Sequence, residues 1–129
     1  MSRYLFDYSQ EYDPSAPLIE LIVQAEGGRS ETVTAFVDSG ADGTIIPLRL
    51  LQKLGARYSD QRLLIGTTGK SQVVGLFPVT LQIGQEMIYG VAAAGYGEEI
   101  ILGRDVLNQI VVILDGPGLT VEVNLASLT

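Results

Sequence analysis

The sequence predicts an all-β domain that contains one or two short helices. Apolar and polar residues alternate with a period of two in several short segments, which is the pattern of half-buried strands. The 129 residues include 15 glycines, which suit the tight turns between such strands. Many short strands separated by glycine turns are typical of a small closed barrel or a sandwich.

The length and composition indicate one compact domain with a short N-terminal arm. Of the 129 residues, 47% are apolar and 18% are charged, so the chain can bury a core without disulfides. Residues 1–16 mix aromatic and acidic side chains without strand or helix periodicity, so we assign 1–16 to an arm and 17–129 to the domain. A frayed terminus and docking on a second subunit are both open interpretations of the arm.

Strand signals follow one another along the domain. Gly27 and Gly28 predict a hairpin turn between two of the strand segments, and Gly84 with Gln85 predicts another turn. The segments with strand character are 18–25, 32–37, 79–83 and 121–125.

Two segments show helix signals. Pro47 begins an apolar run, 47–54, that ends before Gly55, which predicts about two turns of helix closed by a left-handed glycine. The second segment is 105–109, where we expect Asp105 to cap the first turn. The apolar run 110–114 then returns to strand character.

The composition excludes several classes of function. The sequence has no Cys and no His, which rules out disulfides, thiol nucleophiles, Ser-His-Asp triads and His/Cys zinc sites. Its formal net charge of −7 disfavours binding to nucleic acid and to anionic membranes. The sequence starts without an apolar signal segment, and its longest aliphatic run is 110–114, so we expect a soluble cytoplasmic protein that binds no membrane.

Asp38 is the candidate catalytic residue, because an apolar strand leads directly into Asp-Ser-Gly at 38–40. Burying an unpaired carboxylate is costly, so an aspartate at a buried strand end should be hydrogen-bonded, paired or functional. The same tripeptide is also common in ordinary turns. The context favours a functional site: Ala41 and Asp42 follow at once, and a second apolar run closed by glycine, 99–105, comes about sixty residues later.

Two segments resemble the signatures of the retropepsin-like family, the retroviral-type, single-domain aspartic proteases. Residues 36–41 read Phe-Val-Asp-Ser-Gly-Ala and match the first signature, two apolar residues followed by Asp-Ser/Thr-Gly-Ala. Residues 101–107, Ile-Leu-Gly-Arg-Asp-Val-Leu, resemble the second. The resemblance extends in element order from about Leu18 to Leu125. It implies a small closed acid-protease barrel, half of a two-fold pepsin-like architecture, and an aspartic endopeptidase that needs neither cofactor nor metal.

The resemblance assigns roles to the first signature. Asp38 would be the catalytic aspartate, and Ser39, Gly40 and Ala41 would support the active-site loop. Ser39 would brace the two loops of the active site through hydrogen bonds, and Gly40 would leave room for the substrate backbone.

The resemblance also connects the two signatures. Asp42 would contact the main chain of the substrate, and Arg104 would pair with Asp42. A guanidinium suits this task because it can bind a carboxylate through two parallel hydrogen bonds. An exposed ion pair of little energetic value is the alternative interpretation.

The segment 64–75 lies where the family has its β-hairpin flap. Its centre is Gly66, Thr67, Thr68 and Gly69, and the resemblance implies that these residues contact the substrate. The tip is more polar than the glycine and isoleucine tips of the viral enzymes, and a plain surface hairpin is the alternative.

The presence of a single Asp-Ser/Thr-Gly segment implies a homodimer. Peptide hydrolysis by this route needs two carboxylates that share one proton. The nearest second candidate, Asp115 in Asp-Gly-Pro, lacks the hydroxyl residue and the third-position glycine, so we interpret it as a turn residue. We therefore expect two chains, held together by their terminal strands, to bring their Asp38 residues together around a two-fold axis and to act on an extended peptide or protein. A catalytically idle peptide-binding or dimerisation module of the same fold and a structural barrel are the alternatives.

Overall fold

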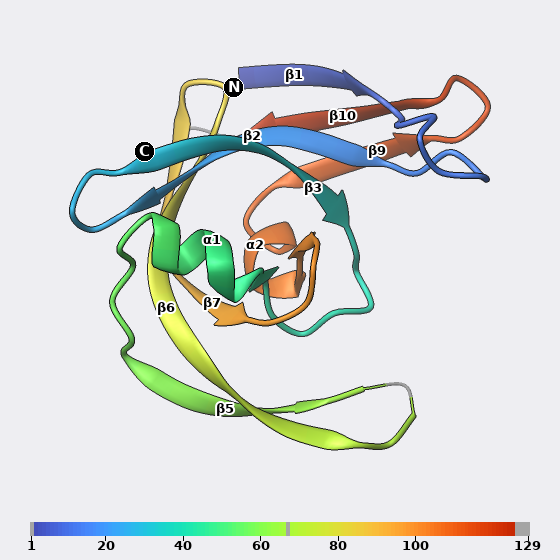
Figure 1. The fold of residues 1–129 in the computed structure, drawn as a ribbon. Helices are drawn as coiled ribbons and strands as arrows, with labels where there is room; N and C mark the ends of the chain where they lie inside the picture. Colours follow the sequence, from blue (N-terminus) through green and yellow to red (C-terminus); the bar gives the residue numbers. More distant parts are fainter. Residues whose placement is uncertain (1, 67, 126–129) are drawn as a thin grey trace.

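The computed structural model describes residues 2–66 and 68–125, which form a closed barrel, a separate three-stranded sheet and two short helices (Figure 1). Within these residues the barrel has six strands, which pair in both parallel and antiparallel directions, and it closes where the last strand pairs with the first. The barrel strands in spatial order are β2 (Leu18–Ala25), β3 (Ser30–Val37), β8 (Ile100–Leu102), β4 (Ile45–Ile46), β7 (Glu86–Gly95) and β6 (Ser71–Ile83). The predicted mainly β class with a small closed barrel is confirmed.

The barrel core is filled by aliphatic side chains from alternate positions of its strands. Strand β2 shows the pattern most clearly, because Leu21, Val23 and Ala25 are buried while Ile22 and Gln24 between them are only half-buried. The first predicted turn is present: β2 and β3 form an antiparallel hairpin, and Gly28 adopts a positive φ of 95° there.

Both predicted helices are present, and one of them begins differently from the prediction. Helix α1 (Leu48–Lys53) follows Pro47, and Gly55 closes it with a φ of 68°, as predicted. Helix α2 (Arg104–Leu107) begins one residue before Asp105, so Gly103 occupies the cap position and the expectation that Asp105 caps the helix is wrong. Arg104 is already helical, and the Asp105 carboxylate instead accepts hydrogen bonds within the first turn and from another segment.

The N-terminal segment forms a strand that pairs within its own chain, so the expectation that it lacks strand periodicity is wrong for residues 2–7. Strand β1 (Ser2–Asp7) pairs antiparallel with β10 (Thr120–Leu125), which also pairs with β9 (Val111–Asp115). Tyr4 and Phe6 lie on the inner face of β1 and pack against the core, and this alternation explains why the segment adopts a strand.

One hairpin extends away from the barrel, at the bottom of Figure 1. It consists of β5 (Asp60–Ile65) and the first half of β6, in the position where the sequence predicts a hairpin. Helices α1 and α2 lie above it in the same view, between β3 and β7. Neither helix of the described residues is long and apolar enough to cross a membrane.

Candidate active site

Asp38 lies directly after β3, in a loop that also contacts β8. The parallel pairing of β3 with β8 aligns Val37 with Leu102, and the Asp38 amide donates to the Leu102 carbonyl at 3.2 Å. The Asp38 carboxylate is exposed, so the expectation of a carboxylate at a buried strand end is wrong; β3 ends at Val37 and the chain turns outward after it. Its Oδ1 accepts a hydrogen bond from the Gly40 amide at 2.9 Å, which fixes the direction of the side chain.

The second signature segment holds this loop through Arg104. The Arg104 amide donates to the Ala41 carbonyl at 2.9 Å, and the guanidinium donates to the Ser39 carbonyl at 2.8 Å and to Asp42 Oδ1 at 2.7 Å. The structure therefore brings Asp42 and Arg104 together as an ion pair. Their side chains are 73% and 45% exposed, so the ion pair by itself contributes about 0–1 kcal/mol. The forked guanidinium contributes mainly geometry, because it ties a carboxylate and a backbone carbonyl to α2.

Thr44, which is buried, and Asp105 form a partly buried connection between the two segments that the sequence motifs did not predict. The Thr44 hydroxyl donates to Asp105 Oδ1 at 2.8 Å and accepts from the Gly103 amide at 3.3 Å, and the Thr44 amide donates to Asp105 Oδ2 at 3.2 Å. Among the residues that the structure describes, Thr44 is the one polar or charged residue that is buried, with 0% exposure. A hydroxyl residue directly before the apolar pair Ile45–Ile46 was the available signal.

The two signature segments also approach each other closely through glycine. A Cβ atom on Gly103 would lie 2.5 Å from the carbonyl carbon and oxygen of Gly43, a separation that real Cβ atoms do not adopt. Backbone can pack directly on backbone here because neither residue has a side chain. The glycine of the second signature is therefore required by the packing against the Asp38 loop.

The hairpin formed by β5 and β6 contacts this loop at its base. The Arg62 guanidinium lies against Gly43, in the space that a side chain at position 43 would occupy. At the tip, the Gly66 amide donates to the Lys70 carbonyl at 3.1 Å, and Gly69 adopts a φ of 81°. Thr68 is exposed next to Gly69, and the predicted substrate contact Thr67 lies outside the described residues.

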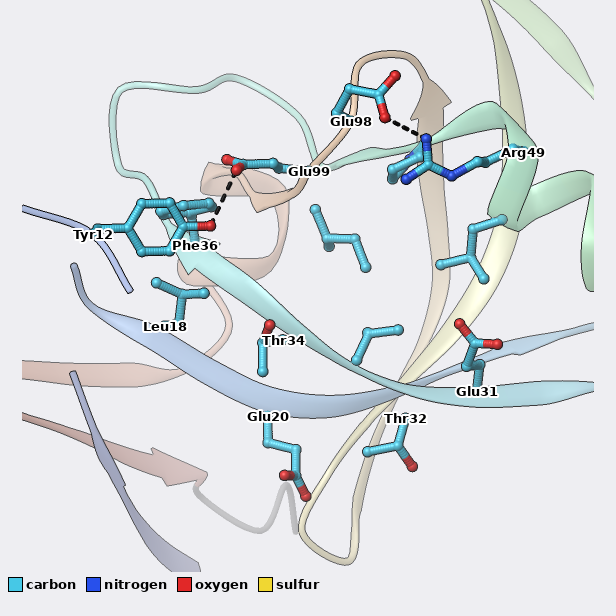
Figure 2. Close-up of a pocket in the computed structure, with 14 residues that line it drawn as sticks. Tyr12, Leu18, Glu20, Glu31, Thr32, Thr34, Phe36, Arg49, Glu98 and Glu99 are labelled. Atoms are coloured by element: carbon cyan, nitrogen blue, oxygen red, sulfur yellow. Dashed lines mark hydrogen bonds and ion pairs between the residues drawn. The ribbon is translucent and has the colours of Figure 1, made fainter. Parts of the chain in front are cut away.

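A hollow separate from the Asp38 loop lies beside β2 and β3 (Figure 2). It has a volume of about 670 Å³, and Asp38 is not among the residues that line it. Tyr12 lies at one end, with its ring 5.0 Å from that of Phe36 in an edge-to-face arrangement and its hydroxyl donating to Glu99 at 3.1 Å. Partial burial and this hydrogen bond to Glu99 raise the pKa of Tyr12 above its ordinary value. Arg49 pairs with Glu98 at the other end.

Comparisons with known proteins find relatives both of the sequence and of the fold. A family model described as "gag-polyprotein putative aspartyl protease" matches residues 26–109, which include both signature segments. The crystal structure of a retropepsin-like aspartic protease from Rickettsia conorii shares 14% sequence identity, covers 98% of this chain and 94% of its own, and superposes with a TM-score of 0.66. The EIAV protease in complex with the inhibitor HBY-793 shares 21% identity over 80% of this chain and 92% of its own, with a TM-score of 0.60.

The structural matches concern the fold, because their sequence identities are low. No curated protein matches the sequence. The family model covers more than half of the chain, and it includes the loop that carries Asp38. The chain belongs to the retropepsin-like aspartyl protease family.

Proposed function

We propose that the protein is an aspartic endopeptidase whose active site forms between two copies of the chain, each of which contributes Asp38. One observation carries the proposal. Asp38 is exposed directly after β3, in the loop of the first signature segment, and Arg104 of the second signature segment holds this loop. A carboxylate in this position is accessible to water, to a peptide and to a second carboxylate.

Two Asp38 carboxylates close together would divide the chemistry between them. Like charges at short distance repel each other, so the two carboxylates would share one proton between them. The ionised carboxylate removes a proton from a water molecule, which attacks the carbonyl carbon of the peptide. The protonated carboxylate donates its proton to the carbonyl oxygen, which gives a tetrahedral intermediate. The intermediate then breaks its C–N bond: the amine leaves with the proton that was taken from water, and the hydroxyl proton returns to the carboxylate pair. Gly40, which follows Asp38 closely, leaves space for the peptide backbone.

The sheet of β1, β10 and β9 supports the homodimer. Strands β1 and β9 are its edges, and an edge strand offers free backbone groups to another chain. Four apolar side chains of these two edges are about half exposed or more: Leu5 at 62%, Val111 at 54%, Leu114 at 51% and Ile113 at 48%. Burying these side chains against a second copy would stabilise a dimer.

The Asp38→Asn variant tests the proposal. The change keeps the shape of the side chain but removes the acid, so cleavage of an unfolded protein and of a peptide library should fall by roughly 10³-fold. Asp13→Asn is the matched control, because Asp13 is an exposed aspartate that lies outside the Asp38 loop, the hairpin and the sheet of β1, β10 and β9. Mass spectrometry of the products measures both variants.

Light scattering combined with assays on dilution tests the shared site. Specific activity should fall once the concentration drops below the dimer dissociation constant. A monomer of constant specific activity would contradict the dimeric site. A dimer that binds peptides without cleaving them would identify the protein as the idle module instead.

A further inference from the structure

Two of the basic side chains stand apart from the rest. The sequence contains eight Lys and Arg residues. Five of them form ion pairs with carboxylates: Arg3, Arg49, Lys53, Arg57 and Arg104. Arg29 donates to the Lys53 carbonyl at 3.3 Å. The other two, Arg62 and Lys70, have no hydrogen-bond or ion-pair acceptor for their side chains within residues 2–66 and 68–125, and both lie on the hairpin of β5 and β6.

Arg62 lies on the face of the hairpin that is turned toward the Asp38 loop. It lies opposite Val74 in the antiparallel pairing of β5 with β6, and the Val74 side chain is only 5% exposed. Paired residues share a face of a hairpin, so Arg62 is on the inner face and is half-buried. Its guanidinium reaches Gly43, the residue after Asp42 in the loop that carries Asp38.

The nearby carboxylates of the chain do not neutralise Arg62. Asp42 Oδ1 accepts from Arg104, and Asp60, two residues before Arg62 on the same strand, accepts from the Gln61 amide at 2.8 Å. The guanidinium of Arg62 therefore lies beside the Asp38 loop without an acceptor among the described residues, while its nitrogen atoms keep contact with water. It can pair with a charged group of a bound peptide without first breaking an ion pair of the protein. The guanidinium binds a carboxylate through two parallel hydrogen bonds, which makes a carboxylate its best partner.

We infer that Arg62 binds the carboxylate of an Asp or Glu side chain in the peptide substrate, and that it thereby sets the specificity of the enzyme at one position near the scissile bond. The inference rests on the proposed endopeptidase function, in which the peptide lies between the hairpin and the Asp38 loop. Gly43 is part of the same subsite, because the absence of a side chain there lets the guanidinium reach the loop.

Paired peptide libraries test the inference. The libraries are identical except that one residue, moved through every position, is Glu in one and Gln in the other. The wild type should cleave the Glu library about tenfold faster than the Gln library at one position. Arg62→Gln should bring this ratio to about one, and Arg62→Glu should bring it below one. Gly43→Ala should also lower the ratio, because a Cβ atom there would collide with Arg62 Nη1 while the charge is retained.

Arg29→Glu is the matched control for the change in net charge. Arg29 lies in the turn between β2 and β3, at the opposite end of β3 from Asp38 and roughly 25 Å away along the strand. This variant should retain the tenfold ratio. Binding of fluorescent forms of the same libraries to the Asp38→Asn protein, measured by anisotropy, gives a second readout that needs no catalysis.

The outcomes separate the inference from the proposed function. Cleavage without a Glu preference, or with a preference that Arg62→Glu leaves unchanged, overturns the inference while the endopeptidase stands. Binding of the Glu library that depends on Arg62, without cleavage by the wild type, supports the Arg62 site and overturns the endopeptidase. A protein that neither cleaves nor binds either library overturns both.

Discussion

The Asp38 loop and the hairpin of β5 and β6 touch at Gly43 and Arg62, but the rest of the chain holds them in different ways. The loop is tied to the second signature segment by the Arg104 amide and guanidinium, and by the hydrogen bonds of Thr44 with Asp105. These contacts join residues about sixty positions apart in the sequence.

The hairpin is held at fewer points. Strand β5 is the edge of its sheet and pairs only with β6 within the described residues. The outer face of the hairpin carries exposed apolar side chains, Leu63 and Ile65 from β5 and Val73 from β6. The Asp38 loop, which carries the reacting carboxylate, is thus fixed by contacts from several sides. The hairpin, which would cover a substrate, has its outer strand β5 attached along one edge only. Matched substitutions in the two regions should therefore differ strongly in effect.

The largest expected difference is between Gly103→Ala and Gly66→Ala. A Cβ atom at position 103 would meet the Gly43 backbone at 2.5 Å, whereas one at position 66 would meet the Lys70 carbonyl at an ordinary 3.9 Å. Because backbone cannot move as a flexible side chain can, Gly103→Ala should lower the free energy of unfolding by about 2–4 kcal/mol. Gly66→Ala should change it by less than about 0.5 kcal/mol. Urea denaturation measures both, and equal losses would show that the two regions are held alike.

A smaller difference is expected between Thr44→Val and Thr68→Val. The first change keeps the shape of a buried side chain but leaves Asp105 Oδ1 and the Gly103 amide without the hydroxyl. Such a loss should cost about 1–3 kcal/mol of stability. Thr68 is exposed at the hairpin tip, so its replacement should be nearly neutral. Thermal unfolding of the two variants compares them directly. An unchanged Thr44→Val protein would show that the hydrogen bonds of the Thr44 hydroxyl do not hold the loop.

The smallest expected effect concerns the sheet of β1, β10 and β9 and depends on pH. Hydrogen bonds from Asn124 and Arg3 lower the pKa of Glu122 below its ordinary value of 4.5. A lowered pKa in the folded state means that ionised Glu122 stabilises the fold above pH 4.5, and that this stabilisation is lost as the pH falls through the lowered value. In Glu122→Gln the free energy of unfolding should depend less on pH below 4.5 than in the wild type. Identical pH profiles of the two proteins would contradict this role of Glu122.

Local patterns predicted the elements that depend on neighbours in the sequence. Pro47 and Gly55 mark the two ends of α1, and Gly28 marks the first hairpin turn, because a fixed or positive φ is a property of the residue itself. The segment around Asp38 was identified in the same way, because its residues are consecutive. The identity of the second segment also followed from consecutive residues, Gly103 and Arg104 among them.

The sequence by itself thus determined the strand alternation, the turns, the short helices and the two signature segments of the family. Tertiary structure decided that Asp38 is exposed, that Asp105 receives the Thr44 hydroxyl instead of capping α2, and that Arg62 lies over Gly43. Each of these facts depends on how closely two distant segments approach and in which register, as when β3 pairs with β8. A local pattern specifies which face of a strand is apolar, but the partner of each polar side chain is chosen only when the segments pack together.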